Sequence, residues 1–325
     1  MAVCQGIGMS KVSRRKMLAG MGAGALGVFG GRTLAAPVQP PAPNTDRRRV
    51  LRLAHMTDFH VQPEDPAPRG MEEAVQHMLA QPDKPELLIT GGDLIMHATE
   101  DDEARVRAQW DIYHRILDEN VDIPIRHTIG NHDVWGWPDR DNDPRRGKVF
   151  AQEELELEKP YYSFDQAGWH FIVLDSTHQR DGGYVAKLDD EQFEWLKDDL
   201  AAQDADTPVL VISHQTIISF CPFFDGENEA SGNWQVTGAW MHIDARRIKD
   251  AFYEAGNVKC AVSGHIHLAD RVDYLGTTYF CNGAVSGGWW GGKYQEFAPG
   301  YGLVNLYDDG SFENEFVTWA PDWPN

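Results

Sequence analysis

From Val50 onward, short apolar runs alternate along the chain with longer segments in which apolar residues recur at helical spacing. Each short run ends in small or polar residues such as Gly, Asp, Asn or His, which is typical of strands that end in loops. The predicted strands are 50–58, 87–93, 125–131, 169–176, 207–214 and 258–265. Because helical segments separate most of these strands, the pattern indicates an α/β chain.

The helices predicted between the strands cover 70–80, 102–119 and 244–255, and a further helix begins after the cap residue Asp189. One face of the second helix is apolar and consists of Val106, Trp110, Tyr113 and Leu117. The last part of the chain predicts antiparallel strands joined by tight turns, of which Asp308-Asp309-Gly310 is the clearest hairpin signal. No internal repeat is visible in the sequence.

The first 36 residues differ from the rest and predict an export signal. Ser13-Arg14-Arg15 precedes a Gly- and Ala-rich apolar tract, and small residues follow at Ala35 and Ala36. The arginine pair resembles a twin-arginine signal, although an ordinary basic start of a membrane anchor is the alternative. The resemblance implies a bacterial protein exported to the periplasm or outside the cell by the twin-arginine machinery. Glycines interrupt the tract, so no stable membrane span is expected after signal removal.

Residues 37–49 predict a proline-rich linker, and residues 50–325 form the expected domain. The 325-residue chain has a net charge of −21. Residues 1–35 hold five of the 29 Lys and Arg and no acidic residue, so the remainder carries 24 basic against 50 acidic residues, a net charge of −26. Such a chain is a poor partner for nucleic acid, because neutralising phosphates requires Lys and Arg.

Three cysteines remain beyond the signal, an odd number without CxxC spacing, which disfavours a zinc–thiolate site. Cys260 and Cys281 lie in predicted strands and are expected to be buried, and a disulfide stays open as an alternative.

Potential metal ligands and acid–base groups gather at the ends of five separate predicted strands. In chain order they are Asp58 and His60, Asp93, Asn131 and His132, His214, and His265 and His267. Side chains alternate between faces in an extended segment, so the two members of each i, i+2 pair should point the same way and serve one centre. Any one of these motifs is weak, and the other eight histidines are expected to be structural; the ordered set of five points to a site.

With these motifs the chain resembles the calcineurin-like metallophosphoesterases, whose pattern is D-x-H, G-D, G-N-H-[DE], H and G-H-x-H. The match spans 58–267 and fills every motif position. The resemblance implies a four-layer β-sandwich of mixed sheets flanked by helices. It also implies two divalent metal ions (Mn, Fe, Zn or Co), a bridging hydroxide that attacks phosphorus, and a small phosphate-ester substrate.

Carried over to this chain, the family pattern places Asp58, His60, Asp93 and His267 on one metal ion. It places Asn131, His214 and His265 on the second, with Asp93 bridging both. Carboxylate, imidazole and amide ligands suit divalent ions of intermediate hardness. His132 is expected to stabilise the transition state and to protonate the leaving oxygen rather than to bind metal.

Two departures narrow the substrate class. Met96 stands where purple acid phosphatases have an iron-binding tyrosine, and 94–99 lacks the Asp-Arg-Gly of protein Ser/Thr phosphatases. The pattern is closest to the branches that cleave cyclic nucleotides and glycerophosphodiesters, so phosphodiesters are slightly favoured. A phosphomonoesterase for phosphate scavenging is the alternative, and a non-catalytic metal-dependent binding module is a more distant one.

Aromatic residues are frequent around the motifs and predict either loop anchors or a substrate wall. The pocket candidates are Trp135, Trp137, Trp289, Trp290, His97 and His178.

Overall fold

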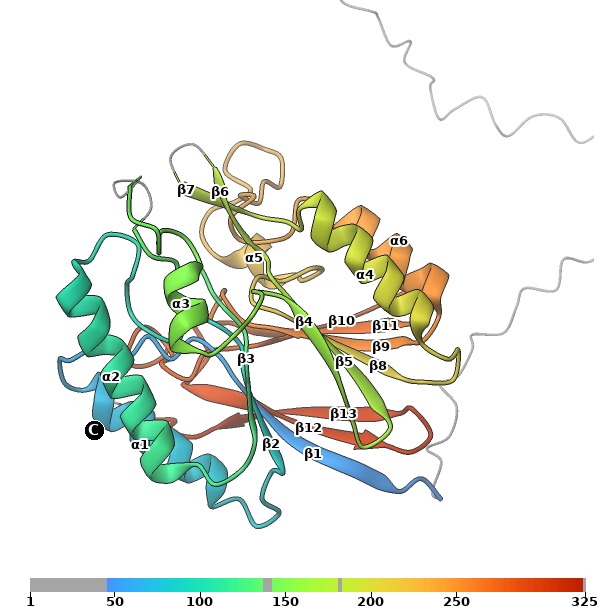
Figure 1. The fold of residues 1–325 in the computed structure, drawn as a ribbon, viewed down its shortest axis with the longest axis horizontal. Coiled ribbons are helices and arrows are strands. Elements are labelled where there is room, and N and C mark those ends of the chain that lie inside the picture. Colours follow the sequence, from blue (N-terminus) through green and yellow to red (C-terminus); the bar gives the residue numbers. More distant parts are fainter. Residues whose placement is uncertain (1–45, 137–141, 181–182, 324–325) are drawn as a thin grey trace, which may run out of the picture. The chain divides into compact units, whose positions relative to one another are not determined.

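Two mixed β-sheets pack face to face in the computed structural model, which describes residues 46–136, 142–180 and 183–323 (Figure 1). The predicted export signal over 1–36, the linker up to residue 45 and Trp137 lie outside the described residues. A compact unit extends from Asp46 to the end of the chain.

The first sheet has five strands in the order β13-β12-β1-β2-β3. Its strands are β1 (Arg49–Met56), β2 (Leu87–Thr90), β3 (Ile125–His127), β12 (Gly300–Tyr307) and β13 (Phe312–Thr318). The pairs β1–β2 and β2–β3 are parallel, whereas β12 is antiparallel to both β1 and β13. The Asp308-Asp309-Gly310 turn joins β12 to β13, so the predicted hairpin is confirmed.

The second sheet has six strands in the order β10-β11-β9-β8-β5-β4. Its strands are β4 (Tyr162–Gln166), β5 (Trp169–Leu174), β8 (Val209–Ser213), β9 (Val258–Ser263), β10 (Ala269–Tyr274) and β11 (Thr277–Asn282). The central four strands are parallel, and β4 and β10 close the two edges as antiparallel strands. A separate hairpin pairs β6 (Thr177–Arg180) with β7 (Gly183–Ala186).

Helices cover the outer face of each sheet. The helices are α1 (Ala67–Leu79), α2 (Glu103–Asn120), α3 (Val149–Glu154), α4 (Asp190–Ala202), α5 (Cys221–Phe224) and α6 (Ala245–Ala255). Figure 1 shows α1 and α2 beside the first sheet, and α4 and α6 over the second. The helical caps follow the sequence, since Asp102 and Asp189 accept hydrogen bonds from the backbone N–H groups of Arg105 and Gln192.

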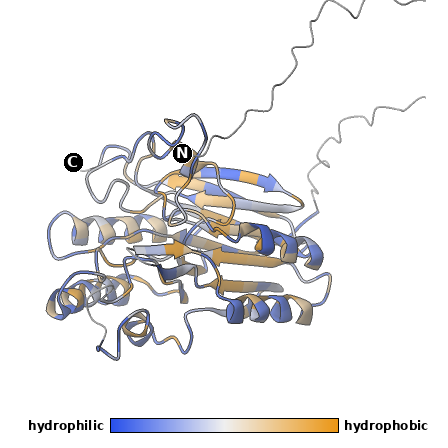
Figure 2. Cartoon of the chain, turned by 90° about the horizontal axis from the view of Figure 1, so that it is seen from above, coloured by the Kyte–Doolittle hydropathy of each residue, from blue (hydrophilic) through white to orange (hydrophobic). Residues whose placement is uncertain are grey.

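Three apolar layers hold these elements together. The middle layer joins the sheets through residues such as Leu53, Ile89 and Phe171, and each outer layer joins one sheet to its helices. The predicted apolar face of α2 is buried. Figure 2 shows hydrophobic colour concentrated in the central strands, while the helices carry both hydrophobic and hydrophilic residues. The predicted four-layer α/β architecture is therefore confirmed. None of the helices in the described part of the chain is long and apolar enough to cross a membrane.

Candidate metal centre

The motif residues lie in loops that directly follow strands β1, β2, β3, β8 and β9. Within the first sheet β1, β2 and β3 run parallel to one another, and within the second sheet β8 and β9 do, so their carboxyl ends open at one edge of each sheet. The loops meet there, and all the ligand candidates from the sequence come together in one cluster.

The backbone of these loops differs from the prediction. Asp58, His60, Asp93, His265 and His267 all have φ between 45° and 72°, so the extended conformation expected for both i, i+2 pairs is wrong. The strands end earlier, at Met56, Thr90 and Ser263. Beyond β1, the N–H groups of Asp58 and His60 donate to the carbonyls of Gly92 and Asp93, each at 3.0 Å. These hydrogen bonds between loops impose left-handed conformations that non-glycine residues rarely adopt, and such strain is common at functional sites.

Asp58, His60 and His267 form one group of potential ligands. Nε2 of His267 lies 3.3 Å from Oδ1 of Asp58 and 3.0 Å from Nε2 of His60. Nδ1 of His267 donates to the carbonyl of Gly287, which orients the ring so that Nε2 faces the cluster. All three side chains are buried.

Asp93, His214 and His265 form a second group, which Asn131 joins. Nε2 of His214 lies 3.2 Å from Oδ2 of Asp93, 3.1 Å from Oδ1 of Asn131 and 3.2 Å from Nδ1 of His265. Nδ1 of His214 donates to the carbonyl of Gly91 at 2.8 Å, so its Nε2 also points inward. Asp93 lies within 3.7 Å of His60 as well, and it therefore stands between the two groups.

Oδ1 of Asp58 is buried, faces Nε2 of His267 and has no hydrogen-bond partner in the described structure, so it fits a metal ligand. Nδ1 of His60 and Nε2 of His265 also lack a partner, but they are the ring nitrogens opposite those that face the cluster. Burial lowers the pKa of His60 well below its usual value and that of His265 to about 3, so both imidazoles are neutral, as metal ligands are. At His214, the carboxylate of Asp93 outweighs burial and raises the pKa to about 9. The carboxylates therefore attract positive charge into this cluster of potential metal-ligand atoms.

Two glycines make the close approach of these loops possible. A Cβ at Gly264 would lie 2.3 Å from Oδ2 of Asp58, and a Cβ at Gly130 would lie 2.2 Å from Oδ1 of Asp93. Both carboxylates therefore sit against bare backbone, which any side chain would displace.

His132 lies beside the cluster and is partly exposed. Its backbone N–H donates to Oδ1 of Asp93 at 2.8 Å, and its Nδ1 donates to the carbonyl of Met96. The ring packs edge-on against His60, with the ring centroids 4.6 Å apart. His132 also forms a third potential ligand group with His60 and Asp93.

Asp133, which the sequence analysis did not single out, holds two of these loops together. Its carboxylate is fully buried and accepts hydrogen bonds from the N–H groups of Leu94, Ile95 and Gly130. Burial, reinforced by the charge of Asp93, raises its pKa to about 7. The signal was present, because Asp133 directly follows Asn131 and His132 in the third motif.

A cavity of about 220 Å³ opens beside the cluster. Five of its lining residues were missed at the sequence level because they come from loops and hairpins without a periodic pattern. These are Tyr184, Asp225, Trp240, Ile266 and Tyr294. Of the predicted pocket residues, Trp289 lines this cavity and is 43% exposed.

The other pocket candidates lie elsewhere. Trp135 is fully buried against Phe150, and Trp290 packs against Trp319 and Trp323. These two indoles anchor loops, which is the alternative that the sequence left open. The rings of His97 and His132 lie 5.6 Å apart, and His178 lies 3.9 Å from Asp175, but neither histidine lines the cavity.

The three cysteines beyond the signal are free and buried. Cys221 and burial together raise the pKa of the Cys281 thiol, so Cys281 lies against Cys221 rather than against Cys260.

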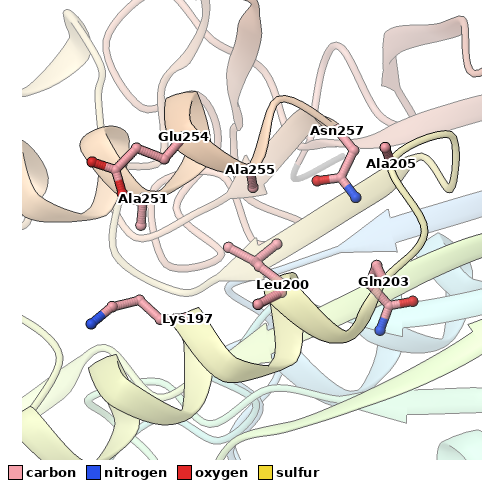
Figure 3. A pocket seen from close by; sticks show the side chains of 9 residues that line it. Lys197, Leu200, Gln203, Ala205, Ala251, Glu254, Ala255 and Asn257 are labelled. Carbon is pink, nitrogen blue, oxygen red and sulfur yellow. The ribbon is translucent and has the colours of Figure 1, made fainter.

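A second concavity of about 400 Å³ lies between the C-terminal halves of α4 and α6, near the amino-terminal ends of β8 and β9 and so opposite the ends that carry the motif loops (Figure 3). Its side chains are mostly alanines and single polar residues such as Lys197, Gln203 and Glu254. Figure 3 shows these side chains along two helices that run side by side, without a converging polar cluster. It offers no set of ligands of the kind found at the strand ends.

Comparison with known proteins gives a consistent picture. The family model described as calcineurin-like phosphoesterase matches residues 51–269. The protein named serine/threonine-protein phosphatase CPPED1 from Bos taurus is 28% identical over 201 residues, 61% of this chain and 58% of that protein. A protein from Rhodococcus erythropolis named probable cyclic nucleotide phosphodiesterase is 23% identical over 274 residues, 79% of this chain and 80% of that protein.

Among solved structures, a dimetal phosphatase from Danio rerio aligns with a TM-score of 0.58 and 13% identity, covering 84% of this chain and all of the other. At this identity the likeness concerns the fold alone.

Proposed function

Because this chain belongs to the calcineurin-like phosphoesterase family, we propose that it is a metal-dependent phosphoric ester hydrolase that cleaves phosphodiesters in preference to monoesters and acts outside the cytoplasm. The family depends on two divalent metal ions. The two groups of potential ligands, with Asp93 between them, fit such a pair. When bound, the ions supply Lewis acidity toward the phosphoryl group and a nucleophile at neutral pH.

In this proposal Asp58, His60, Asp93 and His267 hold one ion, and Asn131, His214 and His265 hold the other, with Asp93 shared. The carbonyls of Gly91 and Gly287 fix the ring orientations of His214 and His267. His132 donates a proton to the leaving oxygen from Nε2, because its Nδ1 is engaged by the Met96 carbonyl. Asp133 positions the loops that carry Asp93 and Asn131.

The observation that carries the preference for diesters is the wall of Trp240, Trp289 and Tyr294 beside the ligand cluster. Such ring surface suits the second ester arm, which a monoester lacks. The carboxylate of Asp225 lines the same wall, and it disfavours the dianion of a monoester more than the monoanion of a diester. The name of the bovine relative keeps a phosphomonoesterase as the second candidate.

The full chain, stripped of metal and reconstituted with Mn, Fe, Co or Zn, tests this function. We expect metal-dependent hydrolysis with a higher kcat/KM for bis-p-nitrophenyl phosphate than for p-nitrophenyl phosphate. A preference for the monoester would favour the phosphatase alternative, and hydrolysis of neither would contradict the proposal.

The site of action rests on Ser13-Arg14-Arg15 and the apolar tract that follows. Cell fractionation tests it, with the double substitution Arg14→Lys and Arg15→Lys as the variant. We expect the unaltered chain outside the cytoplasm and the variant retained inside, and equal distribution of the two would contradict export by the twin-arginine route.

A further inference from the structure

We propose that the wall formed by Asp225, Trp240, Trp289 and Tyr294 binds an ammonium group, so that preferred substrates are phosphodiesters with a short amino-alcohol arm. This inference rests on the proposed function and names the chemistry of one ester arm. A carboxylate, a corner of aromatic rings and a small cavity carry it.

The carboxylate is Asp225, which follows α5 in a loop and is half-buried at the cavity. Its Oδ1 accepts hydrogen bonds from the Tyr294 hydroxyl at 2.6 Å and from Nε2 of Gln295 at 2.9 Å. Within the part of the chain that the structure describes, no Lys or Arg forms an ion pair with Asp225 or lines the cavity. A negative charge is therefore held in place on the wall and remains available to a cationic ligand.

The aromatic corner is made by Trp289 and Tyr294. Their ring centroids lie 5.3 Å apart and their planes meet at 86° in an edge-to-face contact, and Trp240 lines the cavity with them. Perpendicular faces around a carboxylate suit an ammonium group, which is attracted to the face of each ring. A nucleobase is flat and stacks on an aromatic face, so a right-angled corner matches its shape less well than that of a compact cation.

The backbone fixes Trp289 in this position. Trp289 and Trp290 have φ values of 49° and 68°, a rare conformation for two successive bulky residues. Trp290 is 3% exposed, its indole N–H donates to the carbonyl of His60 at 3.0 Å, and its ring lies where a Cβ on Gly70 would clash. With Trp290 anchored, Trp289 turns toward the cluster, and its ring centroid lies 4.3 Å from that of His267. Strain of this kind is kept where function requires a fixed side chain.

The size of the cavity limits the arm. Its volume of about 220 Å³ lies below the range of about 300–1,000 Å³ that is typical of pockets for drug-sized ligands. The phosphoryl group and the metal ions occupy part of this space, so the arm that faces the wall must be short. The chain's net charge of −21 also favours the approach of a substrate with a positive group.

The test compares two diesters that differ only in charge. One is p-nitrophenyl phosphocholine, and the other is p-nitrophenyl 3,3-dimethylbutyl phosphate, in which carbon replaces the quaternary nitrogen. We expect kcat/KM to be roughly 10- to 30-fold higher for the choline ester, the range that a partly desolvated cation–π contact supplies. Equal values for the two esters would overturn the inference.

Two variants test whether the wall causes the preference for the choline ester. Asp225→Asn keeps an oxygen that can accept from Tyr294 and Gln295 but removes the charge, and Trp289→Leu removes one ring face. We expect the ratio of the two kcat/KM values to fall toward one in both variants. The matched control is Glu227→Gln, an exposed acid of the same loop that does not line the cavity, and it should keep the ratio of the unaltered chain.

Further outcomes separate this inference from the proposed function. A ratio that survives both Asp225→Asn and Trp289→Leu would overturn it. A higher kcat/KM for thymidine 5′-(p-nitrophenyl phosphate) than for the choline ester would replace the ammonium group with a nucleobase. If bis-p-nitrophenyl phosphate is cleaved while the choline ester has no advantage, the diesterase stands and the inference falls. If none of these diesters is cleaved with any of the four metals, both fall together.

Discussion

The candidate metal centre and the surroundings of His170 both bring buried histidine together with carboxylates, and they differ in how the ring nitrogens are satisfied. On the side of α4, His170 donates from Nδ1 to Asp165 at 2.7 Å and from Nε2 to Asp199 at 2.8 Å. In the candidate metal centre, Nε2 of His60 and Nε2 of His267 face each other at 3.0 Å, and Nε2 of His265 has no partner in the described structure.

The difference separates a structural histidine from a ligand. A buried polar group normally finds its hydrogen-bond partner within the fold, as His170 does. Imidazole nitrogens that face one another beside buried carboxylates lack such partners, and a bound cation can take their place. Proximity of histidine and carboxylate is therefore common to both places, and only the missing partners distinguish the site. The concavity between α4 and α6 is larger than the cavity at the centre, so size does not locate the chemistry either.

The largest effect is expected from Asp93→Ala, since Asp93 stands between both ligand groups. We expect loss of metal at both positions and a fall in kcat/KM of roughly 10³-fold or more, because the ions supply several kcal/mol of transition-state stabilisation. Metal content by mass spectrometry and rates on bis-p-nitrophenyl phosphate measure the two effects. The matched control is Asp199→Ala, which removes a carboxylate from His170 and should keep metal and activity. Equal metal loss in both variants would break the distinction between the two places.

A smaller effect is expected from His132→Asn, which leaves every proposed ligand in place. We expect kcat to fall by about 10²–10⁴-fold, the usual contribution of acid–base catalysis, while metal content stays at the level of the unaltered chain. The loss should be greater for diesters with an alkyl leaving group than for p-nitrophenyl esters, because a poor leaving group needs the proton more. Loss of metal in this variant would instead make His132 a ligand, as its place in the third group allows.

The sequence predicted the fold and the position of the site better than the backbone conformations that build the site. Strand ends, helix caps and five ordered motifs were readable because they depend on residues close together in the chain. The left-handed conformations of Asp58 and His265 were not, since hydrogen bonds between loops impose them against local preference. Asp225 reaches the cavity from a loop with no periodicity, and the two adjacent tryptophans 289 and 290 are equivalent by sequence although one is buried and one is exposed.

The smallest effect concerns His170, whose contribution should be to stability alone. Burial lowers its pKa, but the hydrogen bonds with Asp199 and Asp165 outweigh burial and raise the pKa above its usual value of 6.5. A group whose pKa is raised by folding stabilises the protein fully below its unfolded pKa and loses that contribution as the pH rises through the folded value. The two hydrogen bonds tie the β4–β5 hairpin and α4 to each other, so the stabilisation is expected in acid and not in base.

The variant His170→Gln tests this sign. Because charged hydrogen bonds on a partly solvated carboxylate are worth about 1–2 kcal/mol, we expect the free energy of unfolding in urea to be lower by that amount at pH 5.5. The gap between variant and unaltered chain should narrow as the pH rises through the folded pKa of His170. Any effect of pH on the metal centre is common to both proteins and cancels in the difference. A gap that stays constant with pH would contradict the expected titration of His170. Loss of metal in the variant would assign His170 to the metal centre instead of a structural role.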